Sequence, residues 1–261
     1  MSLPLFPITS TLHLVRKVGY RYRELGLIKS IRYAAMRAID ITQDFTFDYI
    51  HRVDTGGVAL PTIADGQGYK GSLPHLVRRV LKDVGVCYQD YTFVDLGSGK
   101  GRTLLIASTF PFRRIIGVEA DAALNAVARS NLRCCRVRRQ KCTFLRSVCL
   151  DVRQFQFPLD PLIVYLFNPF TDSVIREVLQ NIQSSLRQKP RPLFLIYLRP
   201  LFGEAVDQCG FLQKVSYRKS RLIQNYSYSI YANADYLSEA AKRNEDSAEI
   251  DPAYGVQADL V

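Results

Sequence analysis

The chain has 261 residues and a formal net charge of +11; 48% of the residues are hydrophobic and 23% are charged, as in one sizeable globular domain. No run of about 18 uncharged apolar residues occurs, so we predict no membrane-spanning helix. The six cysteines form no C-x-x-C pair and show no zinc-ligand spacing, so we expect reduced, mostly buried thiols and no metal site.

Charge is distributed unevenly along the chain. Residues 236–261 carry six carboxylates against two basic side chains, a net −4, so the residues before them carry +15. A body this basic attracts phosphates, anionic lipids or acidic protein surfaces. A solvated surface that keeps the protein soluble explains the charge equally well.

The N-terminal part of the chain predicts a helix over residues 11–38. Apolar side chains recur there in steps of three and four and form one helical face, while the other face is basic. The apolar positions are Leu12, Val15, Val18, Tyr22, Leu25, Ile28, Ile31 and Ala35. We expect this face to pack against the main domain; binding to a membrane surface or nucleic acid is the alternative. The start of the chain is also acid-poor, as in organelle transit peptides, but the periodicity favours a folded helix and a cytoplasmic protein.

Residues 53–72 are rich in glycine and turn formers and predict a long loop, of the kind that often serves as a lid or binding segment. A helix is expected from about Leu73 to Val84. Strands and helices then alternate from Tyr91 onward. Strands are predicted at 92–96, 114–119, 142–149, 162–168 and 192–198, and helices from near 101, at about 121–133 and at about 173–187.

The alternation predicts an open, mostly parallel α/β sheet covered by helices on both faces. Segments 211–218 and 225–233 alternate polar and apolar residues and predict two antiparallel edge strands. Periodicity is lost after about Ala234, where the chain becomes acidic and predicts a disordered tail.

The most informative segment follows the strand at 92–96. An apolar strand ends in Asp95, and three alternating glycines (Gly97, Gly99 and Gly101) open a helix. Glycine allows unusual backbone angles and close approach of a ligand, and open α/β sheets bind ligands at the carboxyl ends of their strands. A Walker A loop is excluded because the Gly-Lys pair is followed by glycine, and the third glycine comes one position early for a dinucleotide fingerprint.

Three further positions lie at the end of a predicted strand or directly after it. Glu119 ends the second strand, where a carboxylate can accept hydrogen bonds from both hydroxyls of a ribose; the alternative is a solvent-exposed side chain. Asp151 follows the third strand and either binds a ligand or caps a turn. Asn168-Pro169-Phe170 follow the fourth strand, and Asn-Pro is also a common way to begin a turn.

These segments resemble class I S-adenosylmethionine-dependent methyltransferases over roughly residues 69–233. The D-x-G-x-G-x-G pattern resembles motif I of that family, and residues 53–57 resemble uncharacterised bacterial methyltransferases. The resemblance implies a Rossmann-like seven-stranded sheet, mostly parallel with an antiparallel C-terminal hairpin, preceded by N-terminal helices. It implies S-adenosyl-L-methionine as the cofactor. The cofactor-binding residues that it implies are Tyr69, Asp95, Gly97, Ser98, Gly99, Gly101, Glu119 and Asp151.

The segment Asn168-Pro169-Phe170 looks like a shortened form of the Asn-Pro-Pro-Tyr/Phe signature of amino-group methyltransferases. This likeness implies that Asn168 orients an acceptor nitrogen, Pro169 stiffens the turn and Phe170 forms a wall for the acceptor. Tyr69, about one helix before the glycine loop, resembles a tyrosine that closes over the cofactor in some protein-lysine methyltransferases. We therefore expect N-methylation of a protein amine; a nucleic-acid base, reached through the basic surface, and a small metabolite are the alternatives. A catalytically silent protein of this fold that binds lipid or nucleic acid is a different class of function.

Three parts of the chain are expected. Residues 1–90 form a helical or lid extension, residues 91–234 form the S-adenosylmethionine-binding catalytic domain, and residues 235–261 form the acidic tail.

Overall fold

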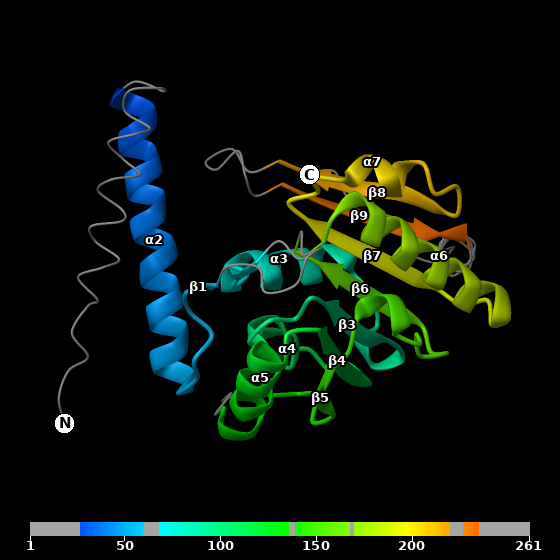
Figure 1. Cartoon of the computed structure of the whole chain (residues 1–261), viewed down its shortest axis with the longest axis horizontal. Coiled ribbons are helices and arrows are strands. Elements are labelled where there is room, and N and C mark those ends of the chain that lie inside the picture. Colours follow the sequence, from blue (N-terminus) through cyan, green and yellow to red (C-terminus); the bar gives the residue numbers. More distant parts are fainter. Residues whose placement is uncertain (1–26, 60–67, 136–138, 168–169, 220–226, 235–261) are drawn as a thin grey trace, which may run out of the picture.

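The computed structural model describes residues 27–59, 68–135, 139–167, 170–219 and 227–234. The predicted acidic tail and the first part of the predicted N-terminal helix lie outside these residues. The described residues form a central β-sheet covered by helices, with one long helix standing beside it (Figure 1).

Seven strands form the central sheet, in the order β5-β4-β3-β6-β7-β9-β8. They are β3 (Thr92–Leu96), β4 (Arg114–Glu119), β5 (Leu145–Cys149), β6 (Leu162–Leu166), β7 (Leu193–Leu198), β8 (Leu212–Arg218) and β9 (Tyr228–Asn233). Neighbouring strands are parallel, except that β9 runs antiparallel to both β7 and β8. The predicted mostly parallel, Rossmann-like seven-stranded sheet with an antiparallel C-terminal hairpin is therefore confirmed.

The hairpin differs from the prediction in one respect. We expected two edge strands, but β9 lies between β7 and β8, and all six of its residues are buried. Ile230 and Tyr231 pack into hydrophobic clusters on opposite faces of the sheet. The polar residues of β9 suggested a solvent-facing side, but they are buried. The Asn233 side-chain oxygen accepts a hydrogen bond from the Leu193 N–H at 2.9 Å. The Tyr228 hydroxyl donates to Asp83, whereas the Tyr231 hydroxyl has no partner among the described residues.

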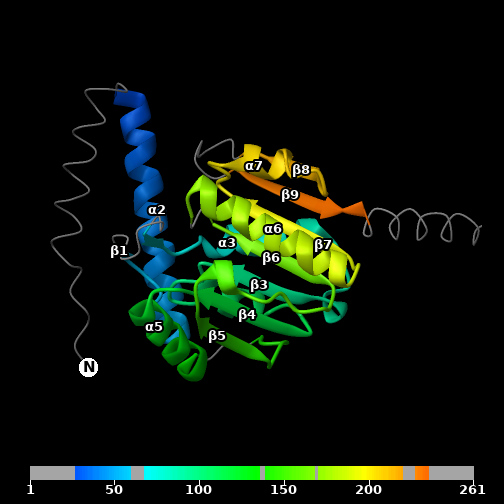
Figure 2. The ribbon, with the colours of Figure 1, turned by 45° about the vertical axis from the view of Figure 1, so that its right-hand side comes forward.

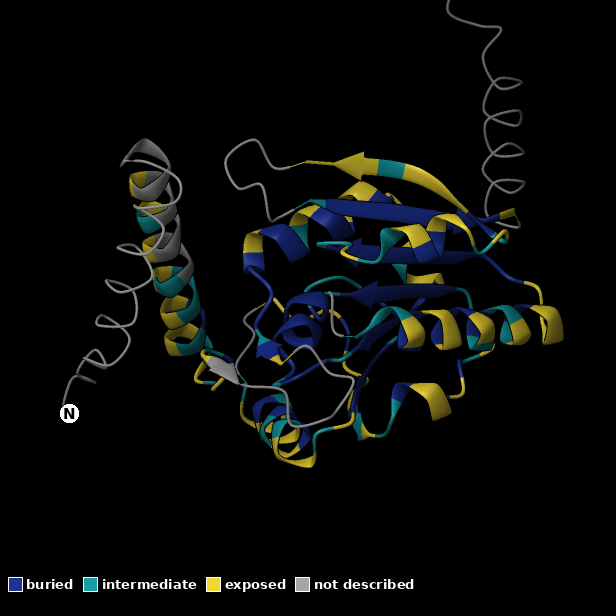
Figure 3. Ribbon diagram, turned by 45° about the horizontal axis from the view of Figure 1, so that its top comes forward, coloured by how far each residue is buried: buried dark blue, intermediate teal, exposed yellow. Residues whose placement is uncertain are grey.

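Helices cover both faces of the sheet. They are α3 (Pro74–Val84), α4 (Arg102–Ala107), α5 (Ala122–Cys134), α6 (Asp172–Gln188) and α7 (Gly203–Asp207), with the 3₁₀ helices η1 (Tyr88–Asp90) and η2 (Val152–Gln154). One hydrophobic cluster joins α3 and α4 to the sheet, and a second joins α6 and α7 to its other face. The middle strands are buried throughout, as expected for parallel strands covered on both sides (Figure 3).

The long helix α2 (Leu27–His51) stands beside the sheet and approaches it with its C-terminal end (Figures 1 and 2). Phe47 is buried there, in the cluster that contains α3 and α4. The prediction that the N-terminal apolar face packs on the main domain is wrong for its two described side chains, because Ile31 is 59% exposed and Ala35 is exposed. The contact is made beyond the predicted helix, which continues past residue 38. None of the described helices, α2 included, is long and apolar enough to cross a membrane.

The predicted loop at residues 53–72 contains a small antiparallel sheet of two strands, β1 (Val58–Ala59) and β2 (Tyr69–Lys70). It leads directly into α3, so the predicted helix at 73–84 is confirmed.

All six cysteines are free thiols, but the expectation that most of them are buried is wrong. Cys142 is buried, whereas Cys87, Cys134 and Cys149 are exposed. Cys134 ends α5 and Cys149 ends the edge strand β5, so neither lies in the covered part of the sheet.

Candidate functional site

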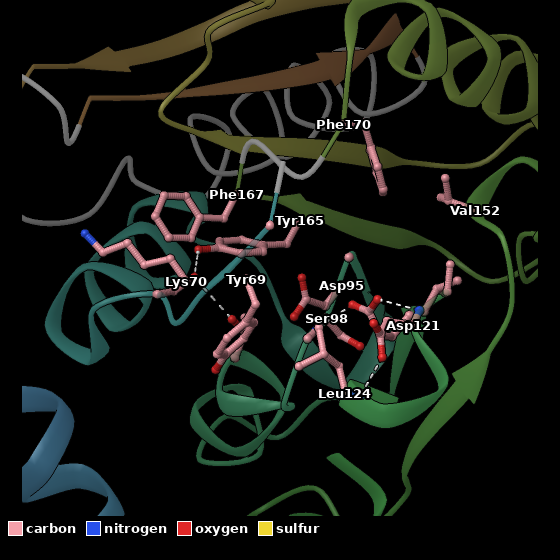
Figure 4. Close-up of a pocket in the computed structure, with 18 of the residues that line it drawn as sticks. Tyr69, Lys70, Asp95, Ser98, Asp121, Leu124, Val152, Tyr165, Phe167 and Phe170 are labelled. Atoms are coloured by element: carbon pink, nitrogen blue, oxygen red, sulfur yellow. Dashed lines mark hydrogen bonds between the residues drawn. The ribbon is translucent and has the colours of Figure 1, made fainter. Parts of the chain in front are cut away.

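A cleft opens at the carboxyl ends of β3, β4 and β6 (Figure 4). It is lined by the glycine loop after β3, the end of β4, the turn after β5, strand β2 and the segment after β6. Of the residues predicted for the site, those that line the cleft are Tyr69, Asp95, Gly97, Ser98, Gly99, Glu119, Asp151 and Phe170. Segments far apart in the sequence thus meet at the edge of the sheet where open α/β folds bind ligands.

Three predicted positions are not among the residues lining the cleft. Gly101 is the N-terminal cap of α4 with φ of 81°, and a β-carbon there would lie 3.3 Å from the Ala128 β-carbon, so its place is structural. Asn168 and Pro169 lie outside the described residues. Their neighbours Phe167 and Phe170 both line the cleft.

The glycine loop is held in place by hydrogen bonds from its backbone. The Gly97 and Ser98 N–H groups donate to the Val118 carbonyl oxygen, and the Gly99 N–H donates to Glu119 Oε2 at 2.7 Å. Gly99 has φ of 51°, and a β-carbon on it would lie 2.2 Å from the ring of Tyr69. Glycine is required there because the Tyr69 ring packs directly on the loop.

Two carboxylates are buried side by side in the sheet beneath this loop. Asp95 is 3% exposed, and burial together with the nearby charge of Glu119 raises the pKa of its carboxyl group to about 8, against the opposing effect of a hydrogen bond from Thr103. Burial also raises the pKa of Glu119, against hydrogen bonds from the backbone of Asp121 and Gly99. The alternative interpretation of Glu119 as a solvent-exposed side chain is therefore wrong, because this residue is 9% exposed. A pair of buried acids at the base of a cleft favours a ligand that carries positive charge or donates hydrogen bonds.

Ser98 places an unsatisfied polar atom at the cleft. Its hydroxyl oxygen is buried and has no hydrogen-bond partner among the described residues. Nearly all buried polar atoms in proteins have a partner, so this hydroxyl marks a place where a ligand or water completes the site.

Asp151 lines the cleft but is already engaged. Its side chain caps η2 by accepting from the Arg153 N–H at 2.9 Å, and it forms an ion pair with the Arg153 guanidinium at 2.6 Å. The hydrogen bonds from Arg153 hold the pKa of Asp151 below its ordinary value. The turn-capping interpretation is thus met, and Arg153 must release at least one of its four hydrogen bonds to Asp151 before this carboxylate can accept from a ligand.

Arg102 is the main residue that the sequence interpretation missed. It begins α4 immediately after the glycine loop, is 1% exposed and forms an ion pair with Asp44 of α2. It also donates to the hydroxyl and the carbonyl oxygen of Thr55, both at 2.8 Å. A β-carbon at Gly71 would lie 2.7 Å from the same guanidinium, so three segments of the N-terminal part close around one side chain.

A sequence signal for Arg102 exists. The N-terminus of a helix carries a partial positive charge, which makes an arginine at the first helical position unfavourable unless anions surround it. Two acidic residues do so here: Asp44 binds the guanidinium directly, and Asp48 lies 3.9 Å from it. Asp48 in turn accepts hydrogen bonds from the backbone N–H groups of Thr55 and Gly56, at 2.9 and 2.6 Å.

Aromatic side chains also line the cleft (Figure 4). Tyr165 is buried in β6 and donates a hydrogen bond to the Ser72 hydroxyl at 2.9 Å. Tyr69 donates to the Thr55 carbonyl oxygen at 2.5 Å, which fixes its ring over Gly99. The ring of Phe170 points into the cleft, and Phe167 lies on the other side of the same segment. These rings restrict the access of water to the buried carboxylates.

No group of three or more metal-binding side chains (His, Cys, Asp or Glu) is found within the described parts of the chain. The groups that line the described cleft include carboxylates, hydroxyls, backbone amides, aromatic rings and the cationic side chains of Lys70, Arg102 and Arg153.

No protein-family model and no curated protein matches the chain. Among solved structures, it is similar to a SAM-dependent methyltransferase from Leishmania major, with 11% identity and a TM-score of 0.46 over 61% of this chain and 71% of that chain. It is also similar to an RNA methyltransferase from Salinibacter ruber in complex with S-adenosyl-L-homocysteine, with 18% identity and a TM-score of 0.43 over 63% and 94%. A third similar structure is a ribosomal protein L11 methylase from Lactobacillus delbrueckii subsp. bulgaricus, with 9% identity and a TM-score of 0.47 over 63% of this chain and 80% of that chain.

Proposed function

We propose that this protein is an S-adenosylmethionine-dependent methyltransferase whose cofactor binds in the cleft above the Gly97–Gly101 loop. The observation that carries the proposal is the buried pair Asp95 and Glu119 beneath this loop, at the carboxyl edge of a sheet with the strand order described above. Walker A and dinucleotide loops require other glycine spacings.

The cleft residues fit the groups of this cofactor. Glu119 suits a ribose, because one carboxylate can accept from two neighbouring hydroxyls. Asp95 suits a positively charged ligand, because a nearby cation offsets the cost of ionising a buried carboxyl group. The unsatisfied Ser98 hydroxyl supplies a further hydrogen bond. Asp151 suits the adenine amino group once the Arg153 side chain releases it, because each Asp151 oxygen already accepts two hydrogen bonds from Arg153.

When bound, S-adenosylmethionine supplies a methyl group that its sulfonium already activates for transfer to a nucleophile. The protein then has to hold both partners in line and exclude water. We assign the exclusion of water to Tyr69, Phe167 and Phe170, which line the cleft. The orientation of the acceptor nitrogen by the Asn168 side-chain oxygen, with Pro169 stiffening the turn, stays a prediction from the sequence.

The acceptor is proposed to be a nitrogen atom. The Tyr69 region of the sequence favours a protein amine, which must be neutral to attack and therefore needs a lowered pKa or a proton acceptor. The basic body favours the second candidate, a nucleic-acid base. A small metabolite is a third candidate acceptor, and a catalytically silent protein that binds lipid or nucleic acid is the competing class of function.

The proposal is tested by calorimetric titration of the full chain with S-adenosylmethionine and S-adenosylhomocysteine. We expect micromolar binding of both, and binding of S-adenosylmethionine weakened about 10- to 100-fold by Glu119→Gln, because a hydrogen bond to a charged group is worth about 1.5–3 kcal/mol.

The matched control is Glu177→Gln, which removes an exposed carboxylate from α6 and is expected to leave the affinity unchanged. A well-folded protein that binds neither compound would refute the methyltransferase proposal and favour the silent binding protein.

A further inference from the structure

A second concave surface lies beside the cleft, between helix α5 and strand β5. It is lined by Arg129, Leu132 and Arg133 from the helix, and by Leu145, Arg146, Ser147, Val148 and Cys149 from the strand. The Ser147 hydroxyl donates to the Asn125 side-chain oxygen at 2.7 Å, which ties the two walls together. We call this surface the α5–β5 groove.

The groove belongs to the most one-sidedly charged part of the chain. Residues 122–150 contain seven Lys and Arg side chains and no Asp or Glu. Five of the seven are described: Arg129, Arg133, Arg139, Lys141 and Arg146 are all exposed. Three of these line the groove. Within the described residues, no ion pair involves any of the three groove arginines.

Requirements of folding do not account for this arrangement. Arg133 lies in the last turn of α5, where the helix dipole favours a cation, but Arg129 lies one turn earlier and repels it. A single charge on an edge strand discourages aggregation, which explains Arg146 alone. Arg129 and Arg133 lie one turn apart on α5, and Arg146 lies on the neighbouring edge strand; because no carboxylate lines the groove, these three positive charges favour the binding of an anion along it.

The chemistry of the groove favours a chain of phosphates. The guanidinium group of arginine presents a planar pair of donors that matches a phosphate. The surface is concave, whereas a membrane is engaged by a protruding amphipathic face. Phe144, directly before Leu145 at one end of β5, is 51% exposed and offers a ring on which a base can stack.

The groove also leads to the cleft. Asp121, which caps the start of α5, lines the cleft, and so do Leu150 and Asp151, which directly follow β5. Figures 1 and 2 show α5 and β5 together at one edge of the molecule. A polymer bound along the groove therefore passes beside the proposed cofactor site.

We propose that the α5–β5 groove binds the phosphate backbone of a nucleic-acid strand, one base of which is the methyl acceptor. This inference rests on the proposed methyltransferase function, and it changes the preferred acceptor from a protein amine to a nucleic-acid base.

The test compares two full-length triple variants with the same change in charge. Arg129→Glu/Arg133→Glu/Arg146→Glu alters the groove, and Lys82→Glu/Arg187→Glu/Lys189→Glu alters exposed side chains on α3 and at the end of α6. Binding to a labelled single-stranded RNA and to a DNA of the same sequence is followed by fluorescence anisotropy at several salt concentrations. Circular dichroism confirms folding, and the corresponding Arg→Gln triple replaces the groove variant if it fails to fold.

We expect the groove variant to bind RNA or DNA on the order of tenfold more weakly or worse. The slope of log K against log salt should fall by about 2, because each phosphate contact with a single strand contributes about 0.7. The control should retain most of the wild-type affinity and slope. The wild type should also transfer labelled methyl groups from S-adenosylmethionine to RNA or DNA, and the groove variant should lose this transfer.

Equal losses in both triple variants would show that net charge alone attracts nucleic acid and would overturn the groove. Stronger retention of the wild type on anionic vesicles than on nucleic acid would overturn it in favour of a membrane surface. Nucleic-acid binding without methyl incorporation would refute the acceptor assignment. Calorimetry with S-adenosylmethionine on the same samples separates the two proposals: cofactor binding without nucleic-acid binding refutes only the groove, and the reverse result refutes the methyltransferase and the acceptor assignment but leaves the groove as a nucleic-acid-binding surface.

Discussion

Asp95 is buried at the end of β3, and burial together with the charge of Glu119 raises the pKa of its carboxyl group from 3.8 to about 8. Folding therefore favours the protonated form of this side chain. The resulting stabilisation is complete below about pH 4 and is lost as the pH rises through 8. If the ionised form of Asp95 binds the proposed cationic ligand, the ligand-free protein is less stable at neutral pH than it would be with an uncharged side chain there.

Asp95→Asn is accordingly expected to raise the Tm of the ligand-free protein at pH 8 by about 3–6 °C, because the amide carries no charge to bury. The gain should shrink as the pH is lowered from 8 to 5, and the variant should bind S-adenosylmethionine more weakly. Thermal unfolding across this pH range measures the first effect and calorimetry the second.

Asp90→Asn, at an exposed position, is the control and should change neither quantity. A Tm difference between Asp95→Asn and the wild type that does not depend on pH would contradict the assignment of the raised pKa to Asp95.

At the scale of elements, Arg102 connects α2, the segment at 54–57 and the turn before α3 to the first turn of α4. Loss of this side chain leaves acidic groups without their partner. We expect Arg102→Met to lower the free energy of unfolding by about 3–5 kcal/mol, as for other buried ion pairs that lose one member. Urea unfolding measures this, and hydrogen exchange should show faster opening of residues 44–57.

The matched control removes a second link between the same segments. Lys100 binds Asp54 at 2.7 Å, but the Asp54 side chain is 69% exposed, so Asp54→Ala is expected to cost less than about 1 kcal/mol. Equal costs for Arg102→Met and Asp54→Ala would show that Arg102 is not the main link.

Elements with a strong local signal were predicted well from the sequence. The strands at 92–96 and 114–119 have the predicted bounds, because apolar runs between turn formers specify buried strands. The position of β9 was not predictable from its alternation, since Tyr228 and Asn233 find their hydrogen-bond partners only in the folded protein. The contact of α2 was missed for a similar reason, because periodicity reveals a face but not its partner.

The candidate site was also predicted only in part. We could predict from the sequence that Asp95, Gly99 and Glu119 lie near each other, because parallel strands end at one edge of the sheet. The engagement of Asp151 by Arg153 and the packing of Tyr69 on Gly99 depend on side-chain geometry that a motif does not contain. The groove arginines are visible in the sequence as an acid-free run, but only the fold shows which of them line the groove.

At the scale of the whole molecule, two regions of opposite charge lie next to each other. The cleft contains buried carboxylates, and the α5–β5 groove contains exposed arginines. The proposed cationic cofactor and the proposed anionic polymer would therefore be attracted to different places and would not compete. Salt screens exposed charges far more than buried ones, so the two binding steps should respond differently to ionic strength.

Raising the salt concentration from 50 to 200 mM is expected to weaken nucleic-acid binding roughly twentyfold, for three phosphate contacts. Binding of S-adenosylmethionine should change less than about twofold over the same range, because the carboxylates it contacts are buried. Anisotropy and calorimetry in the same buffers measure the two responses. A parallel loss of both would contradict the separation of the two sites.

The order of the last two strands affects how the protein is made. β8 precedes β9 in the chain but joins the sheet only through it, so β8 leaves the ribosome before its pairing partner exists. Until residues 228–233 follow, the apolar strand β7 keeps one open edge. Unpaired hydrophobic edges are what chaperones bind and what nucleates aggregation. Translation that stalls before Tyr228 therefore leaves a nascent chain in which β7 has no partner on one edge and β8 has none at all, and that chain depends on chaperones to stay soluble.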